Sequence, residues 1–176
     1  MDDETTLNVL ASGRFMQMVR QGRWEYVRRH TAEGAVAIIA ITDAGELVLV
    51  EQHRVPMGMT CLELPAGLVG DSEKDKGEAL LDAAQRELLE EAGYTASTLE
   101  HLYSVATSPG LSSETIDLFR ATGLTQKHAG GGVDHEDITV HLAKIDELDG
   151  WLAEQQERGT AIDVKVYLAA SLLQRC

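Results

Sequence analysis

The sequence predicts an α+β fold, an α/β/α sandwich in which a mixed β-sheet lies between helices, with additional β-strands at the N-terminus. Two observations predict it. Runs of β-branched and aliphatic residues separated by turn residues dominate the first half of the chain, and segments with helical spacing interrupt and end it. Because 176 residues suffice for one substantial core, we expect a single domain over residues 1–176.

The strands are expected first as two hairpins. Residues 14–20 and 24–29 flank a short polar link at the N-terminus. Residues 35–41 and 46–52 flank the turn-forming cluster that ends at Gly45, and both segments are rich in β-branched and aliphatic residues. Further strands are expected at residues 101–106, 115–121 and 138–143.

Three helices are expected from apolar spacing and from the residues that end or begin them. They cover residues 76–92, 146–157 and 163–174. Gly93 and Gly159 follow the first two helices, where a left-handed residue commonly ends a helix. Asp163 is placed to accept hydrogen bonds from the first free N–H groups of the third.

Composition restricts the class of protein. Hydrophobic residues make up 44% and charged residues 25%, and no apolar run approaches membrane-spanning length. The acidic first residues do not resemble a secretory signal, so we expect cytoplasmic residence. Two cysteines, Cys61 and Cys176, are too few for a disulfide framework.

The net charge of -14 makes a nucleic-acid polymer an unfavourable partner, because phosphodiester backbones are repelled by the overall field. A small anionic substrate would need local cations. Metal ions held by carboxylates and a few well-placed arginines are the expected sources.

The first predicted helix breaks the rules of local stability. One of its faces begins with apolar side chains such as Leu80 and Ala84, and seven residues later it continues with Glu87, Glu90 and Glu91. These carboxylates repel one another and lie near the helix C-terminus, where the helix dipole disfavours negative charge. A bound divalent cation would offset both effects, whereas a solvated acidic face is the alternative interpretation.

Residues 86–94, Arg-Glu-Leu-Leu-Glu-Glu-Ala-Gly-Tyr, closely resemble the core of the Nudix box. Glu78 precedes Arg86 by the interval that the box requires. Two positions depart from the pattern. Tyr94 replaces an aliphatic residue, and Ser72 stands where the first glycine is required, so we expect Gly67 to take that part with a longer loop after it.

The resemblance implies a Nudix fold and a magnesium or manganese site. Its metal-binding residues would be Glu87, Glu90, Glu91 and the backbone carbonyl of Ala66. We count Glu90 and Arg86 among the catalytic residues, and Arg86 with Glu78 would orient the carboxylates. The bound metal would neutralise pyrophosphate oxygens and lower the pKa of a water molecule that attacks phosphorus.

Shorter segments resemble the branch of the family that hydrolyses ADP-ribose and other nucleoside diphosphate sugars. Residues 51–56 are similar to that branch's Arg-Gln-aromatic-Arg-x-Pro strand, although Glu51 and His53 depart from it, and they mark Arg54 as a phosphate ligand. Pro109 resembles the branch's proline beyond the box. The products would be a nucleoside monophosphate and a sugar phosphate.

Two other functions remain open. A GDP-mannose hydrolase has a similar layout, and residues 162–165 loosely resemble that group. A nucleotide-sensing Nudix domain without turnover is the second, although the complete glutamate set argues against it.

The general base is expected in an acidic loop outside the box. Glu136 is our first choice and Asp134 the second, and both follow the glycine-rich residues 130–132, which would let the loop close over substrate. A solvated loop is the alternative. Glu114 is a further candidate contact to substrate or metal.

Residues 1–33 resemble the strands through which members of this branch form homodimers. Trp24 or Tyr26 would stack on the base, and Arg28 or Arg29 would contact a phosphate. Ordinary packing of strand aromatics is the alternative.

Overall fold

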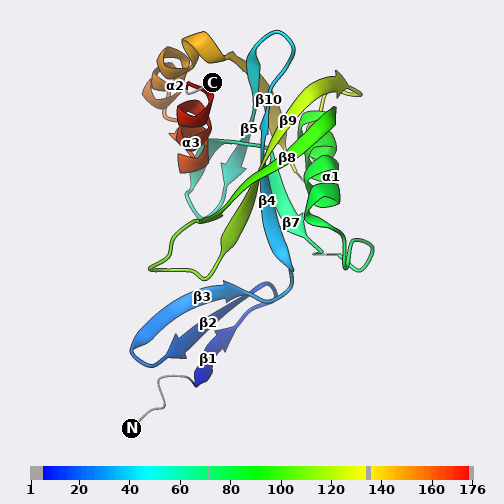
Figure 1. Cartoon of the computed structure of the whole chain (residues 1–176). Helices are drawn as coiled ribbons and strands as arrows, with labels where there is room; N and C mark the ends of the chain where they lie inside the picture. The colour runs from blue at the N-terminus through cyan, green and yellow to red at the C-terminus, as the bar shows by residue number, and fades with distance from the viewer. Residues whose placement is uncertain (1–5, 71, 134–135, 175–176) are drawn as a thin grey trace.

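The computed structural model describes residues 6–70, 72–133 and 136–174 (Figure 1). Its strands are β1 (Leu7–Ser12), β2 (Met16–Gln21), β3 (Trp24–Arg29), β4 (Gly34–Ala40), β5 (Glu46–Arg54), β6 (Met59–Glu63), β7 (Ala66–Val69), β8 (Tyr94–Ala106), β9 (Thr115–Gln126), β10 (Ile138–Lys144) and β11 (Ala161–Ile162). Its helices are α1 (Leu80–Ala92), the 3-10 turn η1 (Ile145–Glu147), α2 (Leu148–Glu157) and α3 (Val164–Leu173). The predicted α+β class is confirmed.

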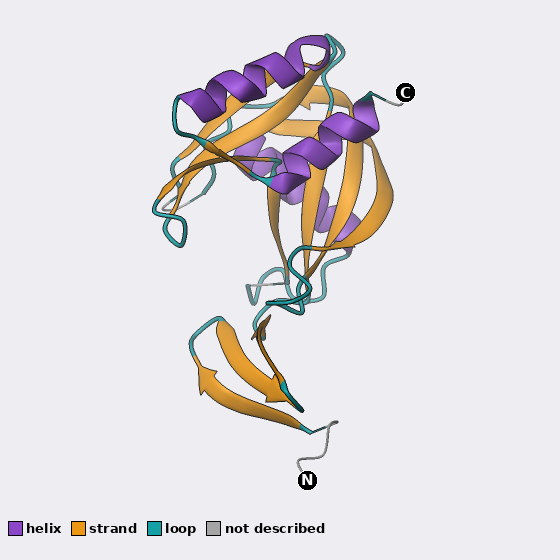
Figure 2. Ribbon diagram, turned by 90° about the vertical axis from the view of Figure 1, so that its left-hand side faces the viewer, coloured by secondary structure: helices purple, strands orange, loops and turns teal. Residues whose placement is uncertain are grey.

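Two four-stranded sheets form the body of the molecule. One has the order β7-β4-β9-β8 and the other β10-β5-β6-β11. Both are mixed, because β4 pairs with β9 in parallel and β11 pairs with β6 in parallel, while their other pairs are antiparallel. Figure 2 shows these sheets between the helices.

The central strands are buried on both faces. Along β4, Ile38 belongs to the core that contains α1, whereas Ile39 belongs to the core that contains α2 and α3. The same alternation on β5 sends Val48 to the first core and Leu49 to the second. The result is a sandwich with α1 on one side and α2 and α3 on the other.

The N-terminal strands form a separate three-stranded sheet in the order β1-β2-β3. Figures 1 and 2 show it set apart from the body. It joins the β8–β9 loop through Val27, whose N–H donates to the carbonyl of Leu111 at 2.9 Å and whose carbonyl accepts from the N–H of Ser113 at 3.2 Å. The organisation as a single domain over residues 1–176 stays a prediction.

The predicted hairpin of residues 35–41 and 46–52 is wrong, although both strands exist. They are β4 and β5, which lie in different sheets, and an isolated bridge between Ile41 and Leu47 is where they pair next to the turn. Each strand is buried on both faces and has a neighbour on either side, so the turn only passes the chain from one sheet to the other.

Other boundaries differ as well. The first helix begins at Leu80 rather than at residue 76, because residues 73–77 form turns and Gly77 has a φ of 77°. Four strands, β1, β6, β7 and β11, were not predicted. Strand β8 begins at Tyr94, before the expected start at residue 101. The N-terminal hairpin of β2 and β3 is confirmed, and so is the Asp163 cap, whose side chain accepts from the N–H of Lys165. In the described residues, no helix is long and apolar enough to cross a membrane.

Candidate active site

Helix α1 carries the carboxylates of the site. Its residues Ala83, Ala84 and Leu88 are fully buried against the sheets, which fixes the rotation of the helix about its axis. That rotation buries Glu91 to 4% exposure and places Glu87 and Glu91 on the wall of one pocket. The helix ends at Gly93, whose φ of 78° is the left-handed conformation expected from the sequence.

Arg86 organises the acidic residues around it. Its Nη2 donates to Glu78 Oε1 at 2.7 Å and to the carbonyl of Leu68 at 3.0 Å. Its Nη1 donates to Glu87 Oε1 at 2.7 Å and to Glu90 Oε2 at 3.2 Å. The hydrogen bonds from Arg86 to Glu78 hold the pKa of the Glu78 carboxyl below its usual range. All four bonds together attach the loop before α1, the helix itself and β7 to one guanidinium group.

The start of β7 touches two of the glutamates directly. The N–H of Ala66 donates to Glu91 Oε2 at 2.9 Å. A Cβ atom on Gly67 would lie 1.9 Å from the carboxyl carbon of Glu87, so a side chain at this position would displace the Glu87 carboxylate. The glycine that approaches the cluster is therefore Gly67, whereas Ser72 lies in the turns before the helix. The metal-binding role of the Ala66 carbonyl stays a prediction.

Burial and negative neighbours raise the pKa values of two carboxyl groups. Burial raises the pKa of Glu91 to about 8, and the charges of Glu87 and Glu136 act in the same direction. Burial likewise raises the pKa of Glu87 to about 7, although Arg86 opposes this shift. The cluster therefore holds more negative charge than its surroundings stabilise.

The donor set fits a hard divalent cation, because carboxylate oxygens are the ligands that magnesium and manganese prefer. The raised pKa values of Glu87 and Glu91 are what such a cation would reverse. In the described part of the chain, no three Asp, Glu, His or Cys side chains are already arranged to hold a metal. Arg86 instead engages Glu87 and Glu90.

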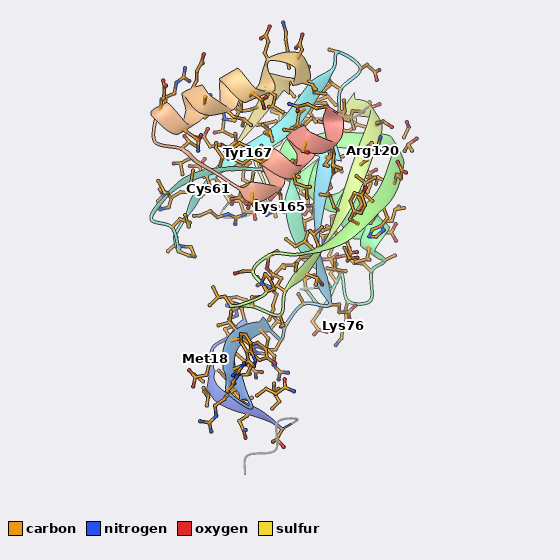
Figure 3. The ribbon with its side chains drawn as sticks, turned by 60° about the vertical axis from the view of Figure 1, so that its left-hand side comes forward. Met18, Cys61, Lys76, Arg120, Lys165 and Tyr167 are labelled. Atoms are coloured by element: carbon orange, nitrogen blue, oxygen red, sulfur yellow. The ribbon has the colours of Figure 1, made fainter. Side chains whose placement is uncertain are left out.

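The pocket that these glutamates line has a volume of about 610 Å³. Its acidic wall contains Glu87, Glu91 and Glu136, and its basic residues are Arg29, Arg54 and Lys165. Figure 3 shows Lys165 of α3 beside Cys61 of β6, which lines the same pocket. Opposite charges thus meet across one cavity, which suits a substrate that carries several phosphate oxygens and needs metal ions.

Each cation of the pocket has a carboxylate partner. Arg54 forms a bidentate pair with Glu63, with Nε to Oε1 at 2.5 Å and Nη2 to Oε2 at 2.7 Å. Arg29 Nη2 lies 3.1 Å from Glu114 Oε1. In the third pair, Lys165 Nζ lies 2.6 Å from Asp163 Oδ2.

Two residues of these ion pairs, Glu63 and Lys165, were not predicted from the sequence as site residues. Glu63 is 6% exposed and stands between Leu62 and Leu64, so a lone charge inside an apolar strand was the signal for a buried partner. Lys165 was noted only as part of a loose resemblance, and its side chain is 13% exposed beside the pocket.

The two arginines of β3 point to opposite faces of the strand, because successive side chains alternate along it. Arg28 donates to Gln17 Oε1 from Nε at 3.0 Å and from Nη2 at 2.8 Å, so it is held within the N-terminal sheet. Arg29 points to the opposite face, where it lines the main pocket with Glu114. The structure thus brings Arg29, and not Arg28, to the carboxylate cluster.

A second cavity of about 460 Å³ lies beside the N-terminal sheet. Trp24 and Tyr26 of β3 line it, together with Pro109, Gly110, Ser112 and Ser113 of the β8–β9 loop. Trp24 is 57% exposed and therefore has a free surface. The structure brings the predicted residues Trp24 and Pro109 together, outside the pocket of the glutamates.

The acidic loop reaches the main pocket through Glu136. Its Oε2 accepts from the N–H of Val133 at 3.0 Å, and its charge contributes to the raised pKa values of Glu87 and Glu91. Asp134, the second choice for the base, lies outside the described residues.

Comparison with known proteins defines the class. Residues 31–161 match the NUDIX domain, so the chain belongs to the NUDIX family. It is a Nudix hydrolase by this match and by its relatives. A crystal structure titled as an ADP compounds hydrolase shares the fold with a TM-score of 0.74, at 22% identity over 97% of this chain and 90% of that one.

Several curated relatives cover most of the chain. It is 37% identical to the ADP-ribose pyrophosphatase of Bacillus subtilis, over 80% of this chain and 72% of the relative. It is 41% identical to the methanol dehydrogenase activator of Bacillus methanolicus, with the same two coverages of 80% and 72%. The GDP-mannose pyrophosphatase of Cronobacter sakazakii is 30% identical over 90% of this chain and 80% of its own length.

Proposed function

We propose that the chain hydrolyses the pyrophosphate bond of ADP-ribose or a related nucleoside diphosphate sugar, giving a nucleoside monophosphate and a sugar phosphate. The observation that carries the proposal is the pocket that Glu87, Glu91 and Glu136 line together with Arg29, Arg54 and Lys165. The relative named ADP-ribose pyrophosphatase supports this substrate class.

We further propose that the cofactor is magnesium, with manganese as a substitute. Glu87, Glu90, Glu91 and the Ala66 carbonyl would hold it. When bound, the metal would supply charge neutralisation at the pyrophosphate oxygens and a lowered pKa of the attacking water. Arg86 would position the carboxylates, since it contacts Glu87 and Glu90 at once.

The phosphates are assigned to the basic side of the pocket. The guanidinium of Arg54 is fixed by Glu63, yet the Arg54 side chain is 42% exposed, so it retains donors for an anion. Arg29 is fixed in the same way by Glu114. Glu136 would take the proton of the attacking water as general base, because it lies on the wall of the same pocket.

The nucleobase is assigned to the cavity beside the N-terminal sheet. Trp24 offers an aromatic face for stacking, and Pro109 lines the same cavity. Residues 112 and 113 line this cavity and Glu114 lines the main pocket, so one loop connects the proposed base and phosphate sites.

A homodimer is part of the proposal. Apart from Trp24, the N-terminal sheet and its turn expose large apolar side chains, namely Val9, Leu10, Phe15, Met16 and Met18. A second copy of the chain would cover such a surface. Sedimentation equilibrium of the full chain tests this, and a monomer at micromolar concentration would contradict it. Cytoplasmic residence stays a prediction.

The function is tested by phosphatase-coupled hydrolysis of a substrate panel with magnesium and with chelator. The panel contains ADP-ribose, ADP-glucose, GDP-mannose, NADH, a dinucleoside polyphosphate and a nucleoside triphosphate. Metal-dependent turnover concentrated on ADP-ribose or ADP-glucose supports the proposal. A preference for GDP-mannose favours the second candidate, which the relative named GDP-mannose pyrophosphatase motivates. Binding without turnover would indicate a sensor.

A matched control separates the cluster from general surface charge. Glu73, whose side chain is 96% exposed, lies in the loop before α1. Glu73→Gln should keep wild-type turnover, whereas Glu91→Gln should lose it.

A further inference from the structure

The glycine-rich segment 130–132 lies against the C-terminal end of α1. In Figure 1, β9 ends beside that end of the helix, and the chain continues from there toward β10. The N–H of Gly131 donates to the carbonyl of Glu91 at 2.9 Å, and the N–H of Gly132 donates to the carbonyl of Glu90 at 3.1 Å. The segment therefore satisfies carbonyl groups that the end of a helix leaves without partners.

The glycines are required by close contact. A Cβ atom on Gly130 would lie 2.5 Å from the carbonyl oxygen of Glu91 and 2.8 Å from the carbonyl carbon of Ala92. A Cβ atom on Gly132 would lie 2.6 Å from Cβ of Glu136. Both glycines also have positive φ angles, 78° and 79°. The sequence suggested flexibility here, but the geometry is that of a tightly docked backbone.

This docked segment leads within a few residues to the proposed general base. The N–H of Glu136 donates to the carbonyl of Val133 at 3.1 Å, and the N–H of Val133 donates to Glu136 Oε2 at 3.0 Å. Val133, the residue after Gly132, thus binds the Glu136 carboxylate through its own N–H. Glu136 lines the pocket together with Glu87 and Glu91.

We propose that Gly130 and Gly132 are positioning residues that set the place of Glu136 relative to the glutamates of α1. The glycine segment is then a backbone clamp, defined as residues 130–132 bonded to the carbonyls of Glu90 and Glu91. The proposal rests on the proposed function, in which Glu136 is the general base.

The clamp links the two halves of the site through the same residues. Glu91 directs its side chain into the pocket, and its carbonyl holds Gly131. A shift of the last turn of α1 therefore moves the carboxylates and the loop together. Proton transfer depends on such positioning, and a misplacement of about 1 Å can cost about 100-fold in rate.

The test is a double-mutant cycle with magnesium and ADP-ribose as the probe. Gly130→Ala and Gly132→Ala should each lower kcat by roughly 10- to 100-fold. Gly132→Ala, whose added Cβ meets Glu136 rather than α1, should do so with little change in the magnesium concentration needed for half-maximal rate. In the Glu136→Gln background, Gly132→Ala should lower kcat by less than about 2-fold, because the group that Gly132 positions is already lost.

Gly45→Ala is the matched control. Gly45 has a φ of 75°, like the clamp glycines, but nothing lies within 4 Å of a Cβ placed there. The Gly45→Ala substitution therefore introduces backbone strain without a clash, and this variant should keep wild-type kcat.

Hydrogen exchange of the metal-free protein gives a readout that needs no turnover. In Gly130→Ala, amides of residues 130–133 and of the last turn of α1 should exchange faster, and in Gly45→Ala they should not. If Gly130→Ala fails to fold, Gly132→Ala carries the test.

The outcomes separate the clamp from the proposed function. Equal losses of kcat with and without Glu136 would overturn the clamp and leave the enzyme assignment intact. Wild-type kcat in Glu136→Gln would refute the general base and the clamp with it. If the wild type hydrolyses no substrate, unchanged exchange in Gly130→Ala would still overturn the docking role, and faster exchange confined to these segments would support it.

Discussion

Replacing Glu91 with glutamine is expected to stop turnover and yet to stabilise the metal-free protein. The side chain is 4% exposed, and burial beside Glu87 and Glu136 raises its pKa to about 8. The folded chain thus binds this proton more tightly than the unfolded chain, whose ordinary value is 4.5. Stability from that proton is fully present below pH 4.5 and is lost as pH rises toward 8.

The magnitude follows from the pKa rise. At about 1.4 kcal/mol per pKa unit, a rise from 4.5 to about 8 sets a ceiling of about 5 kcal/mol on the cost of ionised Glu91. Glutamine removes the titration and still accepts the N–H of Ala66, but it buries a new amide donor. We therefore expect a net gain near 2 kcal/mol at pH 8, or about 4 to 8 °C in Tm.

The assay is thermal unfolding of metal-free wild type and Glu91→Gln between pH 4.5 and pH 8.5. The two melting curves should coincide at the acidic end and separate as pH rises. Added magnesium should stabilise the wild type more than the variant, because a ligand that binds the folded state more tightly stabilises it more.

Glu90→Gln is the matched control on the same helix. Glu90 is 27% exposed and accepts from Arg86, so its loss should leave stability unchanged or slightly lower. If Glu91→Gln also unfolded earlier than the wild type at pH 8, the buried carboxylate would be a structural residue, and the reasoning would be refuted.

Three further changes test individual residues. Glu136→Gln should lower kcat by about 100-fold with unchanged magnesium affinity by calorimetry, and an equal loss of affinity would show that it binds metal. Gly67→Ala should impair both magnesium binding and stability, because the added Cβ would lie 1.9 Å from the Glu87 carboxyl carbon. A magnesium affinity equal to that of the wild type in a calorimetric titration would contradict this close approach. Trp24→Ala should raise KM for ADP-ribose by about 10-fold at constant kcat in steady-state assays, and an unchanged KM would place the base elsewhere.

Helix α1 was predictable because its signals are local. A short stretch of sequence contains the glutamate spacing and the glycine at position 93 that ends the helix. It also contains Glu78, which forms an ion pair with Arg86. Asp163 was predictable for the same reason, since a helix cap depends on its own side chain and the next few N–H groups.

Strand pairing could not be predicted from local patterns. The turn between β4 and β5 is typical of a hairpin, but the choice between pairing across that turn and pairing with distant strands depends on the whole core. The available indication was the uninterrupted run of apolar residues in each strand, because strands that are buried on both faces occupy the interior of a sheet.

The basic side of the pocket was only partly predictable. Arg54 was found through its resemblance, whereas its partner Glu63 comes from a strand that was not predicted. The choice of Arg29 over Arg28 depends on which face of β3 meets the β8–β9 loop, and that contact joins residues far apart in the sequence.

The central claim is that the α1 carboxylates perform metal-dependent hydrolysis of a nucleoside diphosphate sugar. The most direct measurement is product analysis of ADP-ribose incubated at pH 8 with wild type and with Glu91→Gln, each with magnesium and with chelator. The account predicts AMP and ribose 5-phosphate only from wild type with magnesium. Equal product from the variant, or from wild type in chelator, would contradict it.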